Sequence, residues 1–349
     1  MIKNLYNAFT IEERKQLNTV NNNIPPIKNA YIYWNKLLNN DLDEVLKIIF
    51  KTNKKFIDSN YSLENTPPHM MDIDWIQILS KINFTKNYTL KNDETYQNIS
   101  FYPFFKPFLN YYRNSINQTI NNIERELLSQ ECMFNLEQQL LESLLKIAQK
   151  TLILEINYIS EKGRLIGNTP EQRYQAFCDL IDSNFSFKKS MLEEYPVLFR
   201  LLTQKTQNYI NNIKYIISNF NNDKSDIIKE LDYNFDKNIK ITNISMDSGD
   251  THNNQSVSTL TFNNFQKLIF KPRDMSIDIK FNSFIEWLNN HNRKIVPIKT
   301  AKVLNKKNYG WSENISFDYC NNKNDIKTFY KVLGEQLAVL YLLNTTDIH

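Results

Sequence analysis

The spacing of apolar residues changes once along this chain, close to residue 239, and this change constrains the fold more than any other feature. Before that point apolar residues recur at intervals of three and four, as on one face of an α-helix. After it Val257, Leu260 and Phe262 interleave with serine and threonine, which is typical of half-buried strands. The sequence therefore predicts an α+β protein, with a mostly helical region over residues 1–235 and a strand-containing region over residues 236–349.

Length and charge narrow the class of protein. The 349 residues are 41% hydrophobic, which is enough for a sizeable core and for two domains. The 42 basic and 38 acidic side chains give a net charge of +4 without a block of like charge, so no nucleic acid partner is implied. Small anionic ligands remain compatible with this charge.

Cysteine usage and the lack of long apolar runs indicate the compartment. The three cysteines are far apart and odd in number, which argues against a disulfide framework. The N-terminus lacks the apolar run of a signal peptide, and no stretch approaches the roughly 20 apolar residues that span a bilayer. We therefore expect a cytoplasmic protein.

The helical region contains several elements that its pattern predicts. An apolar stripe predicts a long helix over residues 136–160, and Thr169 with Gln172 forms a capping-box pattern that opens another helix. A third helix is predicted over residues 195–220. The Asn-, Asp- and Lys-rich run at residues 221–225 predicts a turn after it.

An aromatic segment interrupts the helical pattern at residues 101–108. Pro103 and Pro107 lie within it, and proline lacks the N–H that a helix interior requires. The segment is therefore not expected to be a regular helix throughout. Clustered aromatic residues of this kind are more often core than a ligand cage.

The second region predicts a small sheet with two helices. Residues 256–271 form a hairpin pattern that turns at residues 263–264. Ser276 is placed to cap the next helix, and Gly310 is expected on or beside a further strand. Asp325 is expected to cap a strongly amphipathic helix.

Three polar features of this region follow the order of parts in a protein or lipid kinase. Gly249 opens a predicted turn that could pass close to phosphate oxygens, and Lys271 ends a predicted strand. Asp347 begins an Asp-x-His sequence after the last helix. Phosphoryl transfer needs cations around the phosphates and a carboxylate that accepts the proton of the attacking hydroxyl. Lys271 would supply the cation and Asp347 the carboxylate.

Each of these features also has an ordinary structural explanation. A lysine at a strand end is usually solvated, and His252 in a polar loop is most often exposed to solvent. Arg273 pairs either with a carboxylate of the fold or with a ligand, and the sequence leaves both open. The combination and order of the features, rather than any one of them, favours a kinase-like site.

The same residues resemble a known family. The pattern comprises Gly249-Asp250-Thr251-His252, Phe270-Lys271-Pro272-Arg273, Gly310-Trp311 and Thr346-Asp347-Ile348-His349, with further similar segments at residues 150–157, 167–174 and 195–200. This pattern resembles the dehydratase domain of the class II lanthipeptide (lantibiotic) synthetases, the LanM family. The likeness covers most of residues 100–349 and is weaker before them.

The resemblance implies a lipid-kinase-like fold that uses ATP and magnesium to phosphorylate Ser and Thr of a ribosomal precursor peptide. The same site would then eliminate phosphate and leave dehydroalanine or dehydrobutyrine. Zinc would belong only to a separate cyclase domain that this sequence lacks. The helical region would help to bind the leader part of the precursor, and association with a membrane exporter is compatible with the resemblance.

The resemblance also assigns roles to individual residues. Gly249 and Lys271 would contact the ATP phosphates. Asp347 would orient or deprotonate the substrate hydroxyl, and His349 would support the catalytic loop. Asp250 and His252 would assist transfer or elimination. No metal ligand is assigned within this sequence.

The sequence also departs from the family pattern. The family has an asparagine three residues after the Asp-x-His sequence, then a metal-binding aspartate, an arginine and a threonine needed for elimination, and the cyclase domain. None of these positions exists in the 349 residues. We therefore expect the chain to be a truncated product, a fragment, or one half of a split enzyme completed by a second polypeptide, with little activity alone.

Two other functions remain open. The chain could be a peptide-binding or scaffolding protein that keeps a degenerate kinase-like fold without the chemistry. It could also be a different kinase-like phosphotransferase. A neighbouring gene for a small Ser-, Thr- and Cys-rich precursor would favour the dehydratase.

Overall fold

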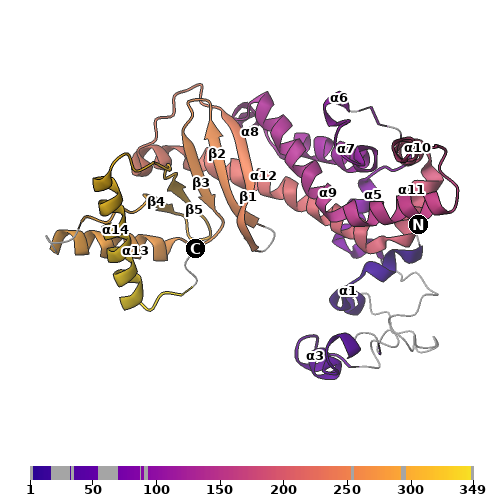
Figure 1. Ribbon diagram of the computed structural model, residues 1–349, viewed down its shortest axis with the longest axis horizontal. Coiled ribbons are helices and arrows are strands. Elements are labelled where there is room, and N and C mark those ends of the chain that lie inside the picture. Colours follow the sequence, from indigo (N-terminus) through magenta and orange to yellow (C-terminus); the bar gives the residue numbers. More distant parts are fainter. Residues whose placement is uncertain are drawn as a thin grey trace. The chain divides into compact units, whose positions relative to one another are not determined.

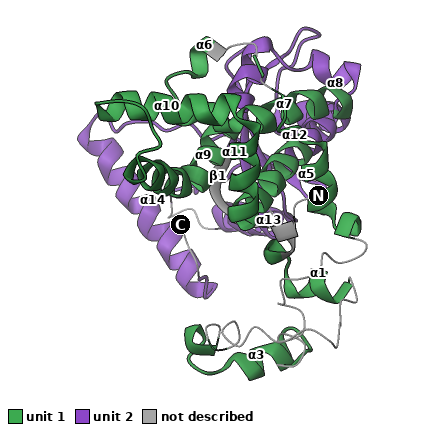
Figure 2. Ribbon diagram, turned by 90° about the vertical axis from the view of Figure 1, so that its right-hand side faces the viewer, with its two compact units in different colours: residues 1–119, 138–211 green, residues 120–137, 212–349 purple. Residues whose placement is uncertain are grey.

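The computed structural model describes residues 3–16, 32, 35–53, 70–86, 88–89, 93–252, 255–291 and 296–346, and of residues 3, 4, 6, 93 and 247–252 it describes the backbone alone. Helices precede a five-stranded antiparallel sheet, so the predicted α+β class is confirmed (Figure 1). The chain forms two compact units (Figure 2). Unit 1 comprises residues 1–119 and 138–211, and unit 2 comprises residues 120–137 and 212–349. The functional boundary expected after residue 235 is a different division and stays a prediction.

Unit 1 is helical in its described part. Its elements are η1 (Lys3–Ala8), α1 (Ile11–Gln16), α3 (Leu42–Ile48), η2 (Met70–Asp72), α5 (Asp74–Lys81), α6 (Asp93–Tyr96), α7 (Tyr102–Thr119), α10 (Pro170–Ser183) and α11 (Phe185–Glu194). Two long helices, α9 (Gln130–Glu161) and α12 (Pro196–Leu231), contribute residues to both units. Helix α9 includes the predicted 136–160 helix and extends it at both ends. The capping box of Thr169 and Gln172 is confirmed at the start of α10.

The core of unit 1 is built from helical stripes. Helix α9 is fully buried at positions spaced as one helical face, namely Leu140, Leu141, Leu144, Ala148 and Leu152. Helix α7 contributes Phe105 and Phe108 and contacts α10. No described helix is long and apolar enough to cross a membrane.

The prediction that residues 101–108 are not a regular helix throughout is wrong from Tyr102 onward, because α7 begins there and continues with Pro107 inside it. Phe101 lies outside the helix, with φ of 58°. Proline in a helix interior costs about 3 kcal/mol. The flanking Phe104, Phe105 and Phe108 are all buried, and burying such a side chain stabilises by roughly 1.5–3 kcal/mol. The burial of three aromatic side chains therefore outweighs the lost backbone hydrogen bond.

The turn predicted at residues 221–225 is also wrong, because α12 continues to Leu231. Its buried stripe passes through the polar run at Phe220, Asp223 and Ile227. The helix stops where Asp232 takes a left-handed conformation, with φ of 58°. A buried, hydrogen-bonded aspartate thus continues the stripe at a position where the sequence indicated a loop.

Unit 2 is built around the sheet. Its strands are β1 (Ile241–His252), β2 (Gln255–Phe262), β3 (Lys267–Lys271), β4 (Val303–Asn305) and β5 (Gly310–Glu313), in the order β1-β2-β3-β5-β4. The predicted hairpin is confirmed, with Thr261 opposite Lys267 on either side of the turn. Side chains alternate along β2, so that Leu260 and Phe262 are buried. Phe220 of α12 packs against Phe262 and Trp311 on this buried face of the sheet.

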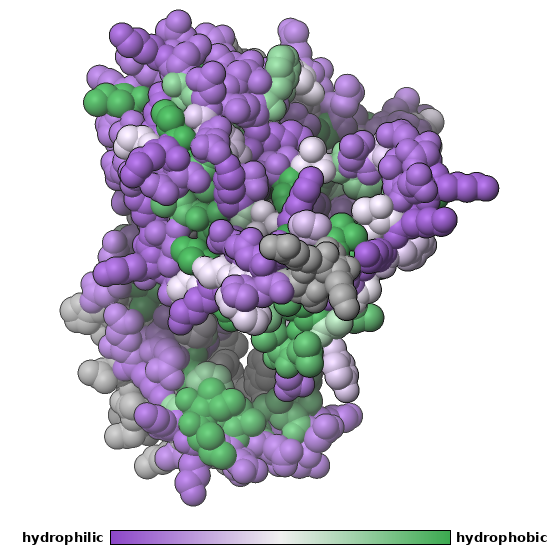
Figure 3. Space-filling view, turned by 90° about the vertical axis from the view of Figure 1, so that its left-hand side faces the viewer, coloured by the Kyte–Doolittle hydropathy of each residue, from purple (hydrophilic) through white to green (hydrophobic). Residues whose placement is uncertain are grey.

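Besides parts of α9 and α12, the described residues of unit 2 include the helices α8 (Asn122–Glu126), α13 (Ser276–His291) and α14 (Lys323–Leu342). The predicted cap at Asp325 is corrected: Asn322 is the N-cap of α14, and Asp325 is the third helical residue of its capping box. The apolar side chains of α14 largely face solvent, with Leu337 65% and Tyr341 84% exposed. Figure 3 shows that apolar residues also reach the surface among polar ones.

Candidate functional site

The candidate site begins at the C-terminal end of β3, where the sequence placed Lys271. Lys271 lies opposite Gly310 of β5. A Cβ atom on Gly310 would come within 2.5 Å of Met275 Sδ and 2.8 Å of the Leu304 carbonyl oxygen. Only glycine therefore fits at this position, and the absence of a side chain lets β5 and the start of α13 approach each other.

Asp278 in the first turn of α13 binds both cations of the Lys-Pro-Arg sequence. Arg273 makes a two-pronged contact, with Nη1 2.7 Å from Oδ2 and Nη2 3.1 Å from Oδ1. Lys271 Nζ lies 3.5 Å from Oδ1 of the same carboxylate. The open alternative for Arg273 is thus resolved in favour of a carboxylate of the fold. Two cations thus contact one carboxylate, and the carboxylate of Asp274 lies close to Arg273 in the same loop.

The loop between β3 and α13 is fixed by an asparagine and an aspartate. Asp274 Oδ1 accepts hydrogen bonds from Ser276 N at 2.7 Å and from Asn305 Nδ2 at 3.0 Å. Asn305 Oδ1 accepts from Met275 N at 3.0 Å. The hydrogen bonds from Ser276 hold the pKa of Asp274 below its usual range. Asp274, rather than the predicted Ser276, therefore supplies the side chain that caps the start of α13.

A buried carboxylate connects the β4–β5 hairpin to α12. Asp223 Oδ2 accepts hydrogen bonds from Tyr309 Oη at 2.9 Å and Trp311 Nε1 at 2.8 Å. Lys306 Nζ lies 3.1 Å from Asp223 Oδ1 and 2.6 Å from Asp226 Oδ2. The contact with Asp226 raises the pKa of Lys306. Because Gly310 lies between Tyr309 and Trp311, this network also fixes the backbone opposite Lys271.

The sheet brings one other predicted segment to the same end. Strands β1 and β3 both run antiparallel to β2, so they run in the same direction and their C-terminal ends lie at one end of the sheet. Gly249, Asp250 and His252 belong to the end of β1. Lys271 ends β3, so the two segments share this end of the sheet.

The predicted turn at Gly249 is wrong, because β1 continues to His252. Ser248 lies opposite Val257 and His252 opposite Gln255, so three residues of β1 face one residue of β2. Gly249 therefore lies in a bulged strand, where the extra residues bend the strand locally. The side chains of Asp250 and His252 lie outside the described residues.

Asp347 and His349 also lie outside the described residues. Their proximity to Lys271 stays a prediction. No group of three or more His, Cys, Asp or Glu side chains that could hold a metal ion occurs in the described part of the chain. Of the predicted site residues, Lys271 is the one whose side-chain contacts are described.

Sequence reasoning missed Asp278 and Asp223. Asp278 could have been found from its position, because it is the first carboxylate in the helix that follows the Lys-Pro-Arg-Asp sequence. Asp223 gave no such signal, because it lies in a polar run that suggested a turn. Its burial became evident only once α12 was seen to pass through that run.

Comparison with known proteins identifies relatives of the chain. The family described as "Domain of unknown function (DUF4135)" matches residues 195–349. The "Lacticin 481/lactococcin biosynthesis protein LcnDR2" of Lactococcus lactis subsp. lactis is 30% identical over 220 residues, which is 61% of this chain and 23% of that protein. The chain thus matches about a quarter of the length of this relative. The resemblance noted in the sequence is confirmed by this homology.

Proposed function

We propose that this chain, a relative of the LanM-type lantibiotic biosynthesis proteins, carries part of a peptide dehydratase. The proposed reaction transfers a phosphoryl group from ATP to Ser or Thr of a precursor peptide and then eliminates phosphate to give a dehydroamino acid. The name of the relative, a protein of lacticin 481 and lactococcin biosynthesis, supports a peptide as the substrate.

The observation that carries the proposal is the contact of Lys271 with Asp278. In protein kinases a strand lysine that contacts the nucleotide phosphates is paired with a carboxylate on the helix that follows. Here Lys271 ends β3, and Asp278 lies in the first turn of the next helix. The order of elements and the ion pair both correspond to that arrangement.

The contact of Lys271 leaves its ammonium group available to a phosphate. Its distance of 3.5 Å from Asp278 is long for a hydrogen bond, whereas Arg273 holds the same carboxylate at 2.7 Å. The ammonium group can therefore donate to phosphate oxygens while Arg273 keeps Asp278 in place. Bound ATP would supply the phosphoryl group that is transferred.

The remaining roles in the proposal follow the family pattern. Asp347 would accept the proton of the attacking hydroxyl, and His349 would support it. Asp250, His252 and the backbone at Gly249 would lie near the phosphates, because the end of β1 shares its end of the sheet with Lys271. Residues 236–349 would then form the nucleotide-binding lobe, and residues 1–235 the helical region. Magnesium belongs to this chemistry, and the described residues offer no group of carboxylates or histidines that could hold it.

The proposal is tested with the chain together with any sequence that its gene encodes after residue 349. A precursor peptide is incubated with the protein, ATP and magnesium, and its mass is measured. The expected result is the addition of phosphate followed by net loss of water at Ser or Thr. A mass that does not change with any precursor encoded near the gene contradicts the proposal.

Lys271→Ala should slow phosphorylation by at least about a hundredfold, as the loss of a charge-stabilising donor does in other transferases. Lys267→Ala is the matched control, because Lys267 is exposed at the opposite end of the same strand. Thermal unfolding of both variants shows whether the fold is kept. If Lys271→Ala phosphorylates the precursor at the rate of Lys267→Ala, the role given to Lys271 is wrong.

A further inference from the structure

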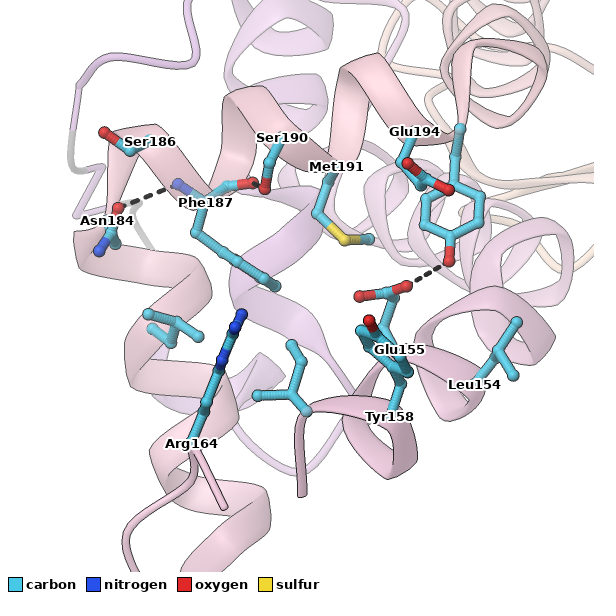
Figure 4. A pocket seen from close by; sticks show the side chains of 13 residues that line it. Leu154, Glu155, Tyr158, Arg164, Asn184, Ser186, Phe187, Ser190, Met191 and Glu194 are labelled. Atoms are coloured by element: carbon cyan, nitrogen blue, oxygen red, sulfur yellow. Dashed lines mark hydrogen bonds between the residues drawn. The ribbon is translucent and has the colours of Figure 1, made fainter. Parts of the chain in front are cut away.

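Unit 1 contains an open pocket of about 770 Å³ that the proposed phosphoryl-transfer site does not use. The pocket is lined by the C-terminal part of α9, by Arg164, by Leu180 of α10 and by α11 with Tyr195 (Figure 4). Its volume falls within the range of about 300–1,000 Å³ that is usual for ligand pockets. All of its lining residues belong to unit 1.

The end of α9 sets the position of Arg164. Gly163 adopts a left-handed conformation with φ of 65°. Arg164 N donates to the Ile159 carbonyl oxygen at 3.1 Å, and Gly163 N donates to that of Ser160 at 2.9 Å. These bonds form a glycine-terminated helix end that turns the chain back. The side chain of Arg164 consequently points into the opening of the pocket (Figure 4).

Arg164 has no anionic partner among the residues that the structure describes. Its guanidinium makes no ion pair or side-chain hydrogen bond with the residues described in this structure. Phe187 of α11 points toward the same opening (Figure 4). Arg164 is exposed and Phe187 is half-buried, so an anionic group held at Arg164 would lie beside an apolar ring at the mouth of the pocket.

The opposite side of the pocket carries two carboxylates, Glu155 and Glu194 (Figure 4). Tyr195 donates its hydroxyl hydrogen to Glu155. Burial and this contact raise the pKa of Tyr195 above its usual value, so the phenol stays protonated. The two carboxylates would repel a ligand with several phosphates, so the pocket favours at most a single acidic group, on the side of Arg164.

The rim of the pocket is apolar where it meets solvent. Leu154 is 60% exposed and Tyr158 is 52% exposed, and they lie four residues apart on one face of α9. Met191 and Phe187 of α11 continue this surface inward. A ligand that covers this surface needs apolar side chains as well as charge.

We propose that the pocket binds a short segment of a peptide in which an acidic side chain lies beside apolar side chains. The acidic group would bind Arg164, and the apolar groups would cover Leu154, Tyr158 and Phe187. That this peptide is the precursor rests on the proposed function. The pocket would then hold the substrate by a segment other than the Ser or Thr that reacts.

The test measures binding directly, without ATP. Three fluorescein-labelled peptides of equal length serve as probes: one with glutamate and leucine, one with lysine in place of glutamate, and one with serine in place of leucine. Fluorescence polarisation gives their affinities for the whole protein. The glutamate and leucine peptide should bind most tightly, and equal affinity for all three contradicts the proposal.

Two variants assign the binding to the pocket. Arg164→Glu should weaken the binding of the glutamate peptide by about tenfold or more, the usual effect of losing one charge-assisted hydrogen bond. The same variant should bind the lysine peptide more tightly than the unchanged protein does. Lys146→Glu is the matched control, because Lys146 is an exposed residue of α9, the helix that precedes Arg164, and does not line the pocket. Equal losses in both variants would show a general charge effect and overturn the assignment.

A precursor experiment separates this inference from the proposed function. If the pocket holds the precursor, Arg164→Glu raises the KM for precursor phosphorylation and leaves kcat nearly unchanged. If KM is unaffected while phosphorylation proceeds, the proposed function stands and the pocket is not the precursor site. If the probes bind as expected but no precursor is phosphorylated, the inference that the pocket binds a peptide is supported and the proposed function is contradicted.

Discussion

Replacing Asp223 tests whether the hydrogen-bonded network under the β4–β5 hairpin stabilises unit 2. Asp223 is 5% exposed and receives hydrogen bonds from Tyr309 and Trp311 and an ion pair from Lys306. In Asp223→Ala the indole N–H of Trp311, which is completely buried, and the hydroxyl of Tyr309 lose their acceptor. Lys306 keeps its contact with Asp226.

The expected loss follows from these contacts. A buried donor left without a partner, as Trp311 Nε1 would be, costs about 1–3 kcal/mol, and the half-buried hydroxyl of Tyr309 adds less, so the free energy of unfolding should fall by about 2–4 kcal/mol. Asp223→Asn keeps one acceptor oxygen and should lose about 1–2 kcal/mol. Asp226→Ala should change the unfolding midpoint far less, because exposed ion pairs contribute little to stability.

Urea unfolding followed by tryptophan fluorescence measures these differences, because Trp311 belongs to the network itself. Far-ultraviolet circular dichroism on the same samples shows whether the transition is common to helices and sheet. The reasoning is refuted if Asp223→Ala unfolds at the same urea concentration as the unchanged protein. It is equally refuted if Asp226→Ala is the more damaging of the two.

Two other predictions concern unit 2. Burial alone would raise the pKa of Glu124, but hydrogen bonds that include one from Lys214 hold it below its usual range. Since the folded-state pKa is the lower one, this stability is present above the unfolded-state pKa and is lost as the pH falls through the folded-state value. Urea midpoints should therefore be measured from neutral pH down to pH values below about 4.3. As the pH falls, the midpoint of the unchanged protein should fall more steeply than that of Glu124→Gln. Parallel curves of midpoint against pH for the two proteins would contradict this. Gly310→Ala should destabilise by about 1–3 kcal/mol, because its Cβ would collide with Met275. Gly334→Ala, which meets no atom within 4 Å in helix α14, should stabilise by up to about 1 kcal/mol, and thermal unfolding of the two variants checks the contrast.

Local patterns predicted much of the fold because they record burial directly. The hairpin of β2 and β3 followed from alternation on either side of a polar turn. The predictions failed where tertiary contacts outweigh local preference. Pro107 stays in a helix because its neighbours are buried, and Asp223 stays in one because the sheet offers it donors.

The candidate site was predictable in part for the same reason. Lys271 could be placed because a strand pattern ends on it. Its partner Asp278 was missed, although its position was a usable signal, because an aspartate in a first helical turn is ordinary. The pocket beside Arg164 was missed altogether, because its residues come from four segments whose proximity no local pattern records.

Arg273 and Lys271 contact Asp278 unequally, and this affects how the residues at the end of β3 would respond to an anion. The guanidinium of Arg273 donates to both carboxylate oxygens, whereas Lys271 makes one long contact. An arriving anion need only displace that weaker contact, and the beginning of α13 keeps its anchor throughout. The amine is therefore free to change partners while its surroundings stay rigid, so the ligand would not have to rebuild the site in order to enter it.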